Sequence, residues 1–254
     1  MKQIFIPILI ILTLGAIILG NIHWNQTVTS TDAYNKEVSP SEAVKSDSNL
    51  PSAIESIPNK EIQKVFKQAA ENEETVKIVF LGSNALGSGT NSWPEMVGTT
   101  LKEEFNNQVA FKTLKYDMTS LQFVQQDKVA DLIKEQPDIV LFEPFTLNNN
   151  GEVSTEDSRK TIQDTINSAK ESKKNTLFIL QPTHPIPNAT IYPSQVEELN
   201  SFAQDNGYLY LNHWANWPDY KTEEIKEYLN EDRSAPNEKG HKVWADTVLD
   251  LFIK

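Results

Sequence analysis

The chain has 254 residues, of which 39% are hydrophobic, and a formal net charge of -12 at pH 7. This length allows one sizeable domain with a short appendage, and this hydrophobic content excludes disorder throughout. The acidic balance disfavours nucleic acid as a partner, because the phosphate backbone is also negative. The absence of cysteine excludes disulfides, thiolate metal sites, a cysteine nucleophile and a lipid-modified cysteine.

The N-terminal residues 4–22 are almost wholly apolar. As a helix they would match the roughly 30 Å thickness of a bilayer core, and Trp24 follows where interfacial Trp is common. No clear small-x-small cleavage site lies in residues 14–22, which favours an uncleaved anchor over a signal peptide. Lys2 places the N-terminus in the cytoplasm. We therefore expect residues 1–24 to be a single-pass anchor in the cell membrane, with the C-terminal domain outside the cytoplasm.

Residues 25–59 are rich in Ser, Thr, Asn, Glu and Pro and contain few apolar residues. Such a segment buries too little surface to offset its ordering entropy, so a flexible extracytoplasmic linker is predicted. Residues 61–71 carry apolar side chains at helical spacing. They are expected to open the folded domain, which we place at residues 60–254.

Strand-like and helix-like segments alternate from residue 76 onward. The expected strands are 76–81, 109–116, 139–142, 176–181 and 208–212. The expected helices are 93–105, 122–135, 155–173, 195–205 and 237–253. This alternation predicts an α/β fold with a doubly wound parallel sheet flanked by helices, in a flavodoxin-like three-layer arrangement. Ligands bind such sheets outside the carboxyl ends of the strands.

Three segments after those strands contain recognisable motifs. They are KIVFLGSNALGSGTNSWPEMV from Lys77, QPDIVLFEPFTLNNNG from Gln136 and EDRSAPNEKGHKVWAD from Glu231. In this order they resemble the SGNH/GDSL hydrolase superfamily: its Gly-Asp-Ser block, its block leading to a catalytic Asn, and its closing Asp-x-x-His-x-Asn-x-x-Gly block. The resemblance runs to the C-terminus and implies a serine esterase or acetyl hydrolase acting on polysaccharide or lipid-like substrates.

The first block departs from the family's pattern at the nucleophile. Aligned without gaps from Gly82, the family's Asp falls on Ser83 and its nucleophilic Ser falls on Asn84. A one-residue deletion would instead make Ser83 the nucleophile. The family's oxyanion glycine should lie within residues 116–120, which contain no glycine.

The other two blocks depart from the pattern as well. The position of the catalytic Asn is best matched by Asn148 or Asn149. Counted from Asp232, the catalytic His falls on Ala235, so that only His241 remains nearby as a base. Because His241 is nine residues from Asp232, a loop would have to fold back to bring the two together.

Other polar and aromatic side chains follow the expected strands. His184 lies in a proline-rich loop, and His213 lies beside Trp214 and Trp217. Aromatic side chains next to polar groups are typical of surfaces that stack on sugar rings, although they also commonly cap a core beneath loops. Glu143 directly follows a buried strand and is either a site carboxylate or a structural one.

Two function classes remain open. The first, which we take as the leading hypothesis, is an ester hydrolase acting on a cell-envelope ester or acetylated glycan. In it Ser83 is the nucleophile, Asn148 the oxyanion donor, and Asp232 with a displaced His241 the base system.

The second class is a catalytically inactive domain that binds a glycan or a protein partner. In either class the predicted substrate or ligand contacts are Asn84, Glu143, His184, His213, Trp214 and Trp217. No cofactor and no metal are predicted, since neither the glycine spacing nor the histidine spacing matches a known binding pattern.

Overall fold

The computed structural model describes residues 50–253, and the predicted membrane anchor lies outside them. No helix within these residues is long and apolar enough to cross a membrane. Among the described residues, two helices precede the first strand: α2 (Leu50–Ser56) and α3 (Lys60–Glu71). Helix α2 buries Ile54 and packs on α3, so ordered structure begins within the stretch predicted to be a flexible linker. The sparse apolar residues of that stretch are concentrated at its end, where Ile54 and Ile57 join the core.

Five parallel strands form one sheet in the order β2-β1-β3-β4-β5. They are β1 (Val76–Gly82), β2 (Val109–Lys115), β3 (Ile139–Phe142), β4 (Leu177–Leu180) and β5 (Leu209–Tyr210). The chain runs from β1 to one edge and returns to β3 on the other side of β1. This order confirms the predicted doubly wound parallel sheet. The reversal between β1 and β3 is the switch point at which such sheets bind ligands.

The helices after β1 are α4 (Trp93–Glu104), α5 (Ser120–Gln125), α6 (Val129–Glu135), α7 (Thr155–Ser172), α8 (Tyr192–Asp205) and α9 (Glu238–Leu249). Three short 3-10 helices follow strands or loops: η2 (Asn84–Leu86), η3 (His213–Asn216) and η4 (Glu223–Tyr228). The single helix expected over residues 122–135 is wrong. It is broken into α5 and α6 at Asp127, whose φ of 54° lies in the left-handed region.

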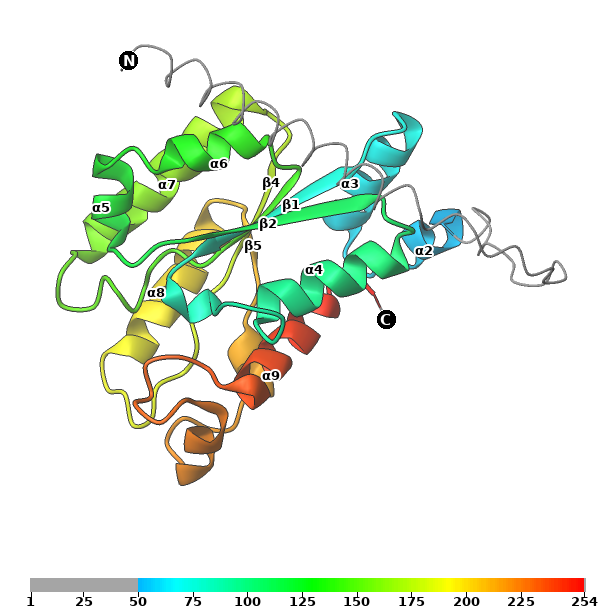
Figure 1. Ribbon diagram of the computed structural model, residues 1–254. Coiled ribbons are helices and arrows are strands. Elements are labelled where there is room, and N and C mark those ends of the chain that lie inside the picture. Colours follow the sequence, from blue (N-terminus) through cyan, green and yellow to red (C-terminus); the bar gives the residue numbers. More distant parts are fainter. Residues whose placement is uncertain (1–49, 254) are drawn as a thin grey trace, which may run out of the picture. The chain divides into compact units, whose positions relative to one another are not determined.

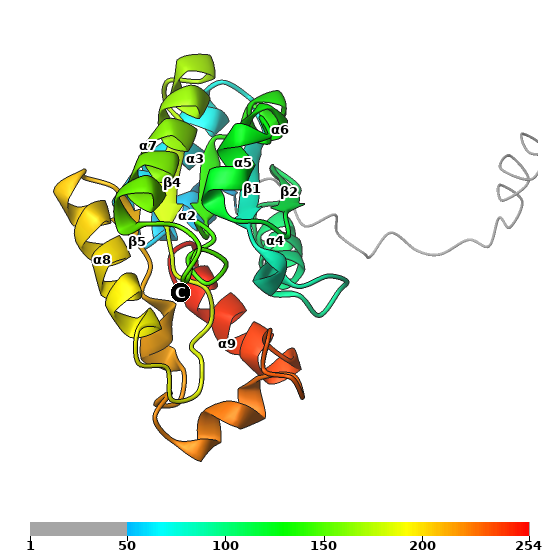
Figure 2. The same cartoon turned by 90° about the vertical axis from the view of Figure 1, so that its left-hand side faces the viewer.

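The helices cover both faces of the sheet. Successive side chains of a strand point to opposite faces, so Phe80 packs with α3, α4 and α9 while Leu81 packs with α5, α6, α7 and α8. Figure 1 shows these two groups of helices on either side of the strands, and Figure 2 shows α7 and α8 together on one face. The result is the expected three-layer arrangement, with an apolar core on each side.

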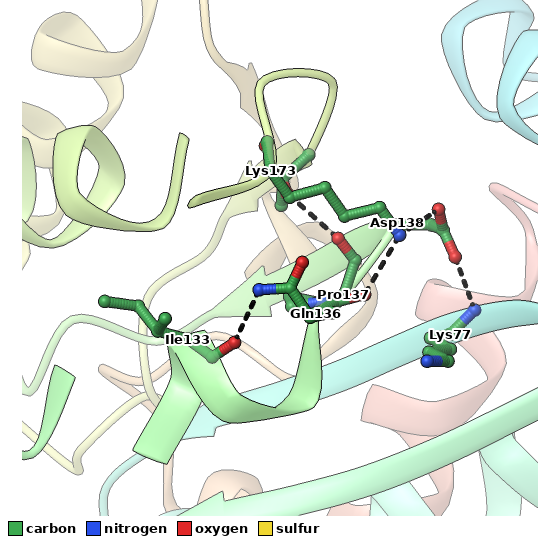
Figure 3. Close-up of polar contacts among 7 residues, drawn as sticks. Lys77, Ile133, Gln136, Pro137, Asp138 and Lys173 are labelled. Atoms are coloured by element: carbon green, nitrogen blue, oxygen red, sulfur yellow. Dashed lines mark hydrogen bonds and ion pairs between the residues drawn. The ribbon is translucent and has the colours of Figure 1, made fainter. Parts of the chain in front are cut away.

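A partly exposed polar network links the amino ends of the strands, opposite the switch-point edge (Figure 3). The Asp138 carboxylate accepts a hydrogen bond from the Lys77 backbone at 2.9 Å and pairs with Nζ of Lys173 at 2.7 Å. The same Nζ donates to the backbone carbonyl of Gln136 at 2.9 Å. These contacts hold β1, β3 and the α7–β4 turn together. They help to fix the register of the central strands from their amino ends.

Candidate functional site

The carboxyl ends of β1 and β3 meet at Ser83 and Glu143. The backbone N–H of Ser83 donates to Oε2 of Glu143 at 2.8 Å, and the N–H of Thr146 donates to Oε1 at 3.2 Å. Glu143 is fully buried, and burial raises the pKa of its carboxyl, while hydrogen bonds from Ser83 and Thr146 act in the opposite direction. A buried carboxylate therefore lies beside the turn after β1, and it comes from the neighbouring strand.

The hydroxyl of Ser83 is occupied by local contacts. Ser83 caps η2, with Oγ accepting from the N–H of Ala85 at 3.3 Å, and its side chain lies close enough to Glu143 to lower the pKa of that carboxyl. Only 2% of Ser83 is exposed. Asn84, the next residue, opens η2 and is exposed. The residue that the ungapped alignment puts at the nucleophile position is thus accessible, whereas Ser83 is not.

His241 lies on α9, against the loop that follows η2. Its Nδ1 accepts from the backbone N–H of Trp93 at 3.4 Å, and a Cβ added to Gly87 would lie 2.6 Å from the imidazole ring. Burial lowers the pKa of His241 to about 4. Asp232 is exposed and accepts from the N–H of Ser234 at 2.9 Å within its own turn. Across residues 50–253 no hydrogen bond joins Asp232 to His241, so the fold-back that the hydrolase hypothesis requires has no contact to support it.

His213 is part of the core. Its Nε2 donates to the carbonyl of Pro182 at 2.9 Å, its Nδ1 accepts from Nε1 of Trp217 at 3.0 Å, and its ring stacks on Trp244 at 4.2 Å. Burial lowers its pKa to about 3. Trp217 is buried with it, whereas Trp214 is half-buried and donates from Nε1 to the carbonyl of Thr183 at 2.7 Å. The core-capping interpretation of these aromatic residues therefore fits their contacts, and ligand binding by His213 or Trp217 would need the loop to open.

His184 is fully buried beneath the loop that contains Arg233. Its Nδ1 lies 3.2 Å from Oγ1 of Thr183, and its Nε2 is buried with no hydrogen-bond partner among the described residues. Burial lowers the pKa of His184 to about 4, and nearby His241 lowers it further. The carbonyl of Arg233 faces the ring and acts in the opposite direction without completing a hydrogen bond to Nε2. Arg233 itself has a left-handed φ of 62°.

The sequence did not single out Tyr192 or Gln181, although both belong to the same edge. The hydroxyl of Tyr192 is buried without a partner in the described structure, close enough to Glu143 that the carboxylate raises the tyrosine pKa further. Gln181 is fully buried at the end of β4 and accepts from Nε1 of Trp244 at 2.9 Å. Their positions directly after β4 and at the start of α8 were the available signal, since this edge of the sheet is where polar groups collect.

The two candidate oxyanion residues differ in what they contact. Asn149 is buried, accepts from the N–H of Ser120 at 2.8 Å, and donates to Oγ of Ser120 and of Ser158 at 2.9 Å and 3.1 Å. Through these hydrogen bonds its side-chain amide holds the β3–α7 loop against α5 and α7. Asn148 is half-buried on the same loop. Within the described residues, the side-chain amide of Asn148, unlike that of Asn149, is not held by such hydrogen bonds. Its role as the oxyanion donor stays a prediction.

Metal ligation is not suggested by the side chains in this region. Within the part of the chain that the structure describes, no group of three or more His, Cys, Asp or Glu side chains is placed to hold a metal ion. The three histidines of the domain instead form a buried series in which His184 interacts electrostatically with both His213 and His241. Burial lowers the pKa of each of these imidazoles, which favours their uncharged form, and within the described residues none of them is an exposed base beside an exposed serine.

Comparisons with known proteins agree with this fold. No protein-family model and no curated protein matches the sequence. Among solved structures, a protein described as a GDSL-like lipase from Parabacteroides merdae matches with a TM-score of 0.60 and 12% identity, over 70% of this chain and 96% of that one. A protein described as a lipolytic member of the G-D-S-L family, from Desulfitobacterium hafniense, gives 0.57 and 21%, over 70% and 99%. A catalytic mutant of an acetylxylan esterase from Geobacillus stearothermophilus gives 0.58 and 14%, over 71% and 96%.

The architecture is therefore that of the SGNH/GDSL hydrolases. Five parallel strands, helices on both faces and the switch-point edge all correspond to the fold that these lipases and esterases share. The structural comparisons confirm the fold that the resemblance of the three motif blocks implied. Identities of 12% and 21% establish the fold and leave the chemistry of the site to its own residues.

Proposed function

We propose that this protein is a membrane-anchored SGNH/GDSL-type domain, outside the cytoplasm, that recognises an ester-bearing or acetylated glycan of the cell envelope. In this proposal the family's serine chemistry is lost and the sheet-edge site is kept for binding. The apolar run of residues 4–22 supports the anchor, and the likeness to esterases that include an acetylxylan esterase supports the ligand class. The acidic surface argues against a polyanionic ligand.

The observation that carries the proposal is the state of Ser83. A serine attacks only when a base within hydrogen-bond reach takes its proton. Ser83 is buried, its N–H donates to Glu143, its Oγ accepts from the N–H of Ala85, and the family's catalytic histidine, counted from Asp232, falls on Ala235. His241 is the remaining candidate base. Within residues 50–253 its side chain forms no hydrogen bond with a carboxylate. These features fit recognition of a ligand better than hydrolysis by a triad.

A second candidate is the ester hydrolase with Ser83 as nucleophile and His241 as base. It is favoured by one observation, that the His241 ring lies against Gly87, four residues after Ser83. Both residues are thus at the same edge of the sheet. Rearrangement of the η2 turn would have to expose the buried Ser83 hydroxyl before the two could act together.

The deciding experiment measures hydrolysis and binding on the same purified chain. Turnover of p-nitrophenyl acetate and of an O-acetylated xylo-oligosaccharide is compared for the wild type, Ser83→Ala and His241→Ala, with Ser201→Ala on the exposed surface of α8 as the matched control. Binding of the acetylated oligosaccharide is measured by calorimetry. We expect binding, with turnover in the wild type no higher than in Ser83→Ala.

Two outcomes would contradict the proposal. Turnover that disappears in Ser83→Ala but not in Ser201→Ala would establish the serine hydrolase, and the His241→Ala result would then identify or exclude the displaced base. Absence of both turnover and binding would remove the acetylated glycan as the ligand.

A further inference from the structure

A narrow cleft opens between α7 and α8, next to the β3–α7 loop. Arg159 from α7 and Gln195 and Glu198 from α8 contribute its polar lining, and Thr146 and Asn149 connect it to the switch-point edge. Ile162, Leu199 and Phe202 contribute its apolar lining. The two helices lie on the same face of the sheet (Figure 2). Of these residues, only Asn149 was considered a candidate site residue from the sequence.

The size of the cleft limits what it can hold. Its free volume is about 40 Å³. Because a water-sized group needs roughly 10–15 Å³ by this measure, there is room for about three or four such groups. A whole sugar ring is too large for this space. A short substituent that projects from a ring is of the right size.

The polar atoms of the cleft specify the chemistry of that substituent. Oε1 of Gln195 is buried and has no hydrogen-bond partner among the described residues. It is an acceptor, so the ligand that satisfies it must bring a donor. Arg159 forms no ion pair with any residue of the described chain and offers several N–H donors to a carbonyl oxygen. The substituent therefore needs one N–H or O–H and one carbonyl.

The remaining lining decides between candidates that meet this need. Ile162 and Leu199 are buried and apolar, which suits a methyl group. Glu198 adds a carboxylate to the rim, which disfavours an anionic ligand such as free acetate. An O-acetyl ester has the methyl and the carbonyl but no donor for Gln195. An acetamido group has all three: a methyl, a carbonyl and an N–H.

We infer that the α7–α8 cleft binds the acetamido group of an N-acetylated amino sugar. Gln195 accepts from the amide N–H, Arg159 donates to the carbonyl oxygen, and the methyl lies against Leu199. This inference rests on the proposed recognition of an envelope glycan and names a substituent that the glycan carries. It places the sugar ring itself outside the cleft, on the side of Thr146 and the switch-point edge.

The test compares two disaccharides that differ in the acetamido group. Binding of N,N′-diacetylchitobiose and of cellobiose to the full chain is measured by calorimetry or ligand-observed NMR. We expect cellobiose to bind at least about tenfold more weakly. Gln195→Met keeps the side-chain length but removes the acceptor, and should weaken binding of diacetylchitobiose about three- to tenfold. Gln204→Met, on the exposed face of the same helix, is the matched control and should leave binding unchanged.

A second variant protects the test against a folding defect in Gln195→Met. Arg159→Ala alters an exposed side chain and should weaken diacetylchitobiose binding without affecting cellobiose. Equal affinity for the two disaccharides, or wild-type affinity in both variants, would overturn the inference. If the O-acetylated oligosaccharide binds while diacetylchitobiose does not, the inference fails and the proposed function stands. If neither binds, both fail.

Discussion

The backbone N–H of Ser83 and Oε2 of Glu143 lie 2.8 Å apart and join the carboxyl ends of β1 and β3 at the switch point of the sheet. This bond links the turn after β1 to a fully buried carboxyl group on the neighbouring strand. A buried acceptor of this kind is costly to remove, because the donors that face it would be left unpaired. The pair therefore stabilises the loop geometry at the edge where the candidate site lies.

Replacing Glu143 by Gln tests this role. In the wild type, the two carboxyl oxygens accept hydrogen bonds from the N–H groups of Ser83 and Thr146. The amide of Gln keeps one acceptor oxygen, but its NH₂ group would face one of these N–H donors. We expect the free energy of unfolding to fall by about 1–3 kcal/mol near neutral pH. Equilibrium urea unfolding of the two proteins measures this loss, and an unchanged midpoint would show that the pair does not stabilise the fold.

The difference in unfolding free energy between the wild type and this variant should depend on pH in a definite direction. Burial raises the pKa of Glu143 in the folded state above its usual 4.5. The stability that the protonated carboxyl contributes is therefore fully present below about pH 4.5 and is lost as the pH rises through the folded pKa. Since Gln cannot ionise, the advantage of the wild type over Glu143→Gln should shrink as the pH rises from 4 to 8. A growing advantage would mean that the ionised form is the one the fold prefers.

The buried histidines should make the domain sensitive to acid. Burial lowers the pKa of His184 and His241 to about 4 and that of His213 to about 3, against 6.5 for an exposed imidazole. A lowered pKa contributes stability that is present above pH 6.5 and lost as the pH falls toward 4, because the unfolded chain binds the proton first. Between pH 7 and pH 5 we expect His184 alone to account for a loss of roughly 2 kcal/mol in unfolding free energy.

The measurement for this prediction is the slope of unfolding free energy against pH. The slope of the wild type is compared with that of His184→Gln, which cannot take up the proton. The variant should show a shallower slope between pH 7 and pH 5 whatever its stability at pH 7. Parallel slopes would show that His184 titrates in the folded protein as it does in water.

Two glycines on one loop provide an internally matched stability test. Gly87 and Gly89 both have positive φ values, 79° and 77°, which L-residues rarely adopt. A Cβ on Gly89 would meet no atom within 4 Å, whereas one on Gly87 would lie 2.6 Å from the ring of His241. Gly89→Ala should therefore cost about 1–2 kcal/mol from backbone strain alone. Gly87→Ala should cost about 3–5 kcal/mol because overpacking adds to the strain.

The position of His241 gives this comparison a second readout. If its ring rests on Gly87, the imidazole NMR signals should shift in Gly87→Ala and stay in place in Gly89→Ala. Equal destabilisation by the two variants, with unchanged imidazole signals, would show that the His241 ring does not contact Gly87. It would also weaken the hypothesis of an ester hydrolase with His241 as the base.

Much of this architecture is predictable from the sequence, and the exceptions have physical causes. Buried strands such as Ile139–Phe142 are short apolar runs ended by turn residues, and their periodicity is local. The break at Asp127 is not visible in such a pattern, because apolar spacing continues across it and a single left-handed residue interrupts the helix. Helix α2 was missed because its few apolar residues are diluted by polar neighbours, although Ile54 is buried against α3.

The site was less predictable than the fold. The sequence placed Ser83, Glu143 and His184 at one edge, because the carboxyl ends of parallel strands lie together, and it placed His241 in the closing helix. It could not show that Glu143 binds Ser83, since this depends on the strand pairing of β1 with β3. Nor could it show that the His213 ring stacks on Trp244, which comes from the last helix. Tertiary contacts of this kind decide whether a polar loop residue faces a ligand or the core.

The proposed loss of the family's triad can be tested by restoring it. Asn84 is exposed at the first residue of η2, the position of the family's serine in the ungapped alignment. Counted from Asp232, the family's catalytic histidine falls on Ala235, three residues further on. The double variant Asn84→Ser/Ala235→His should therefore gain hydrolysis of p-nitrophenyl acetate above the wild-type rate. A serine with an adjacent base is activated in a way that a serine alone is not, so each single variant should show little or no gain.

The controls for this restoration use the same two positions. Adding Asp232→Asn to the double variant should reduce the gained rate, because the carboxylate orients and stabilises the imidazolium that forms during attack. Adding Ser83→Ala should leave the gain in place if Asn84 marks the nucleophile position, and should abolish it if the one-residue deletion is the correct alignment. A double variant that folds normally, as judged by its urea midpoint, and yet shows no gain would mean that the oxyanion side of the site has also been lost. Residues 116–120, which lack the family's glycine, would then be the next segment to restore.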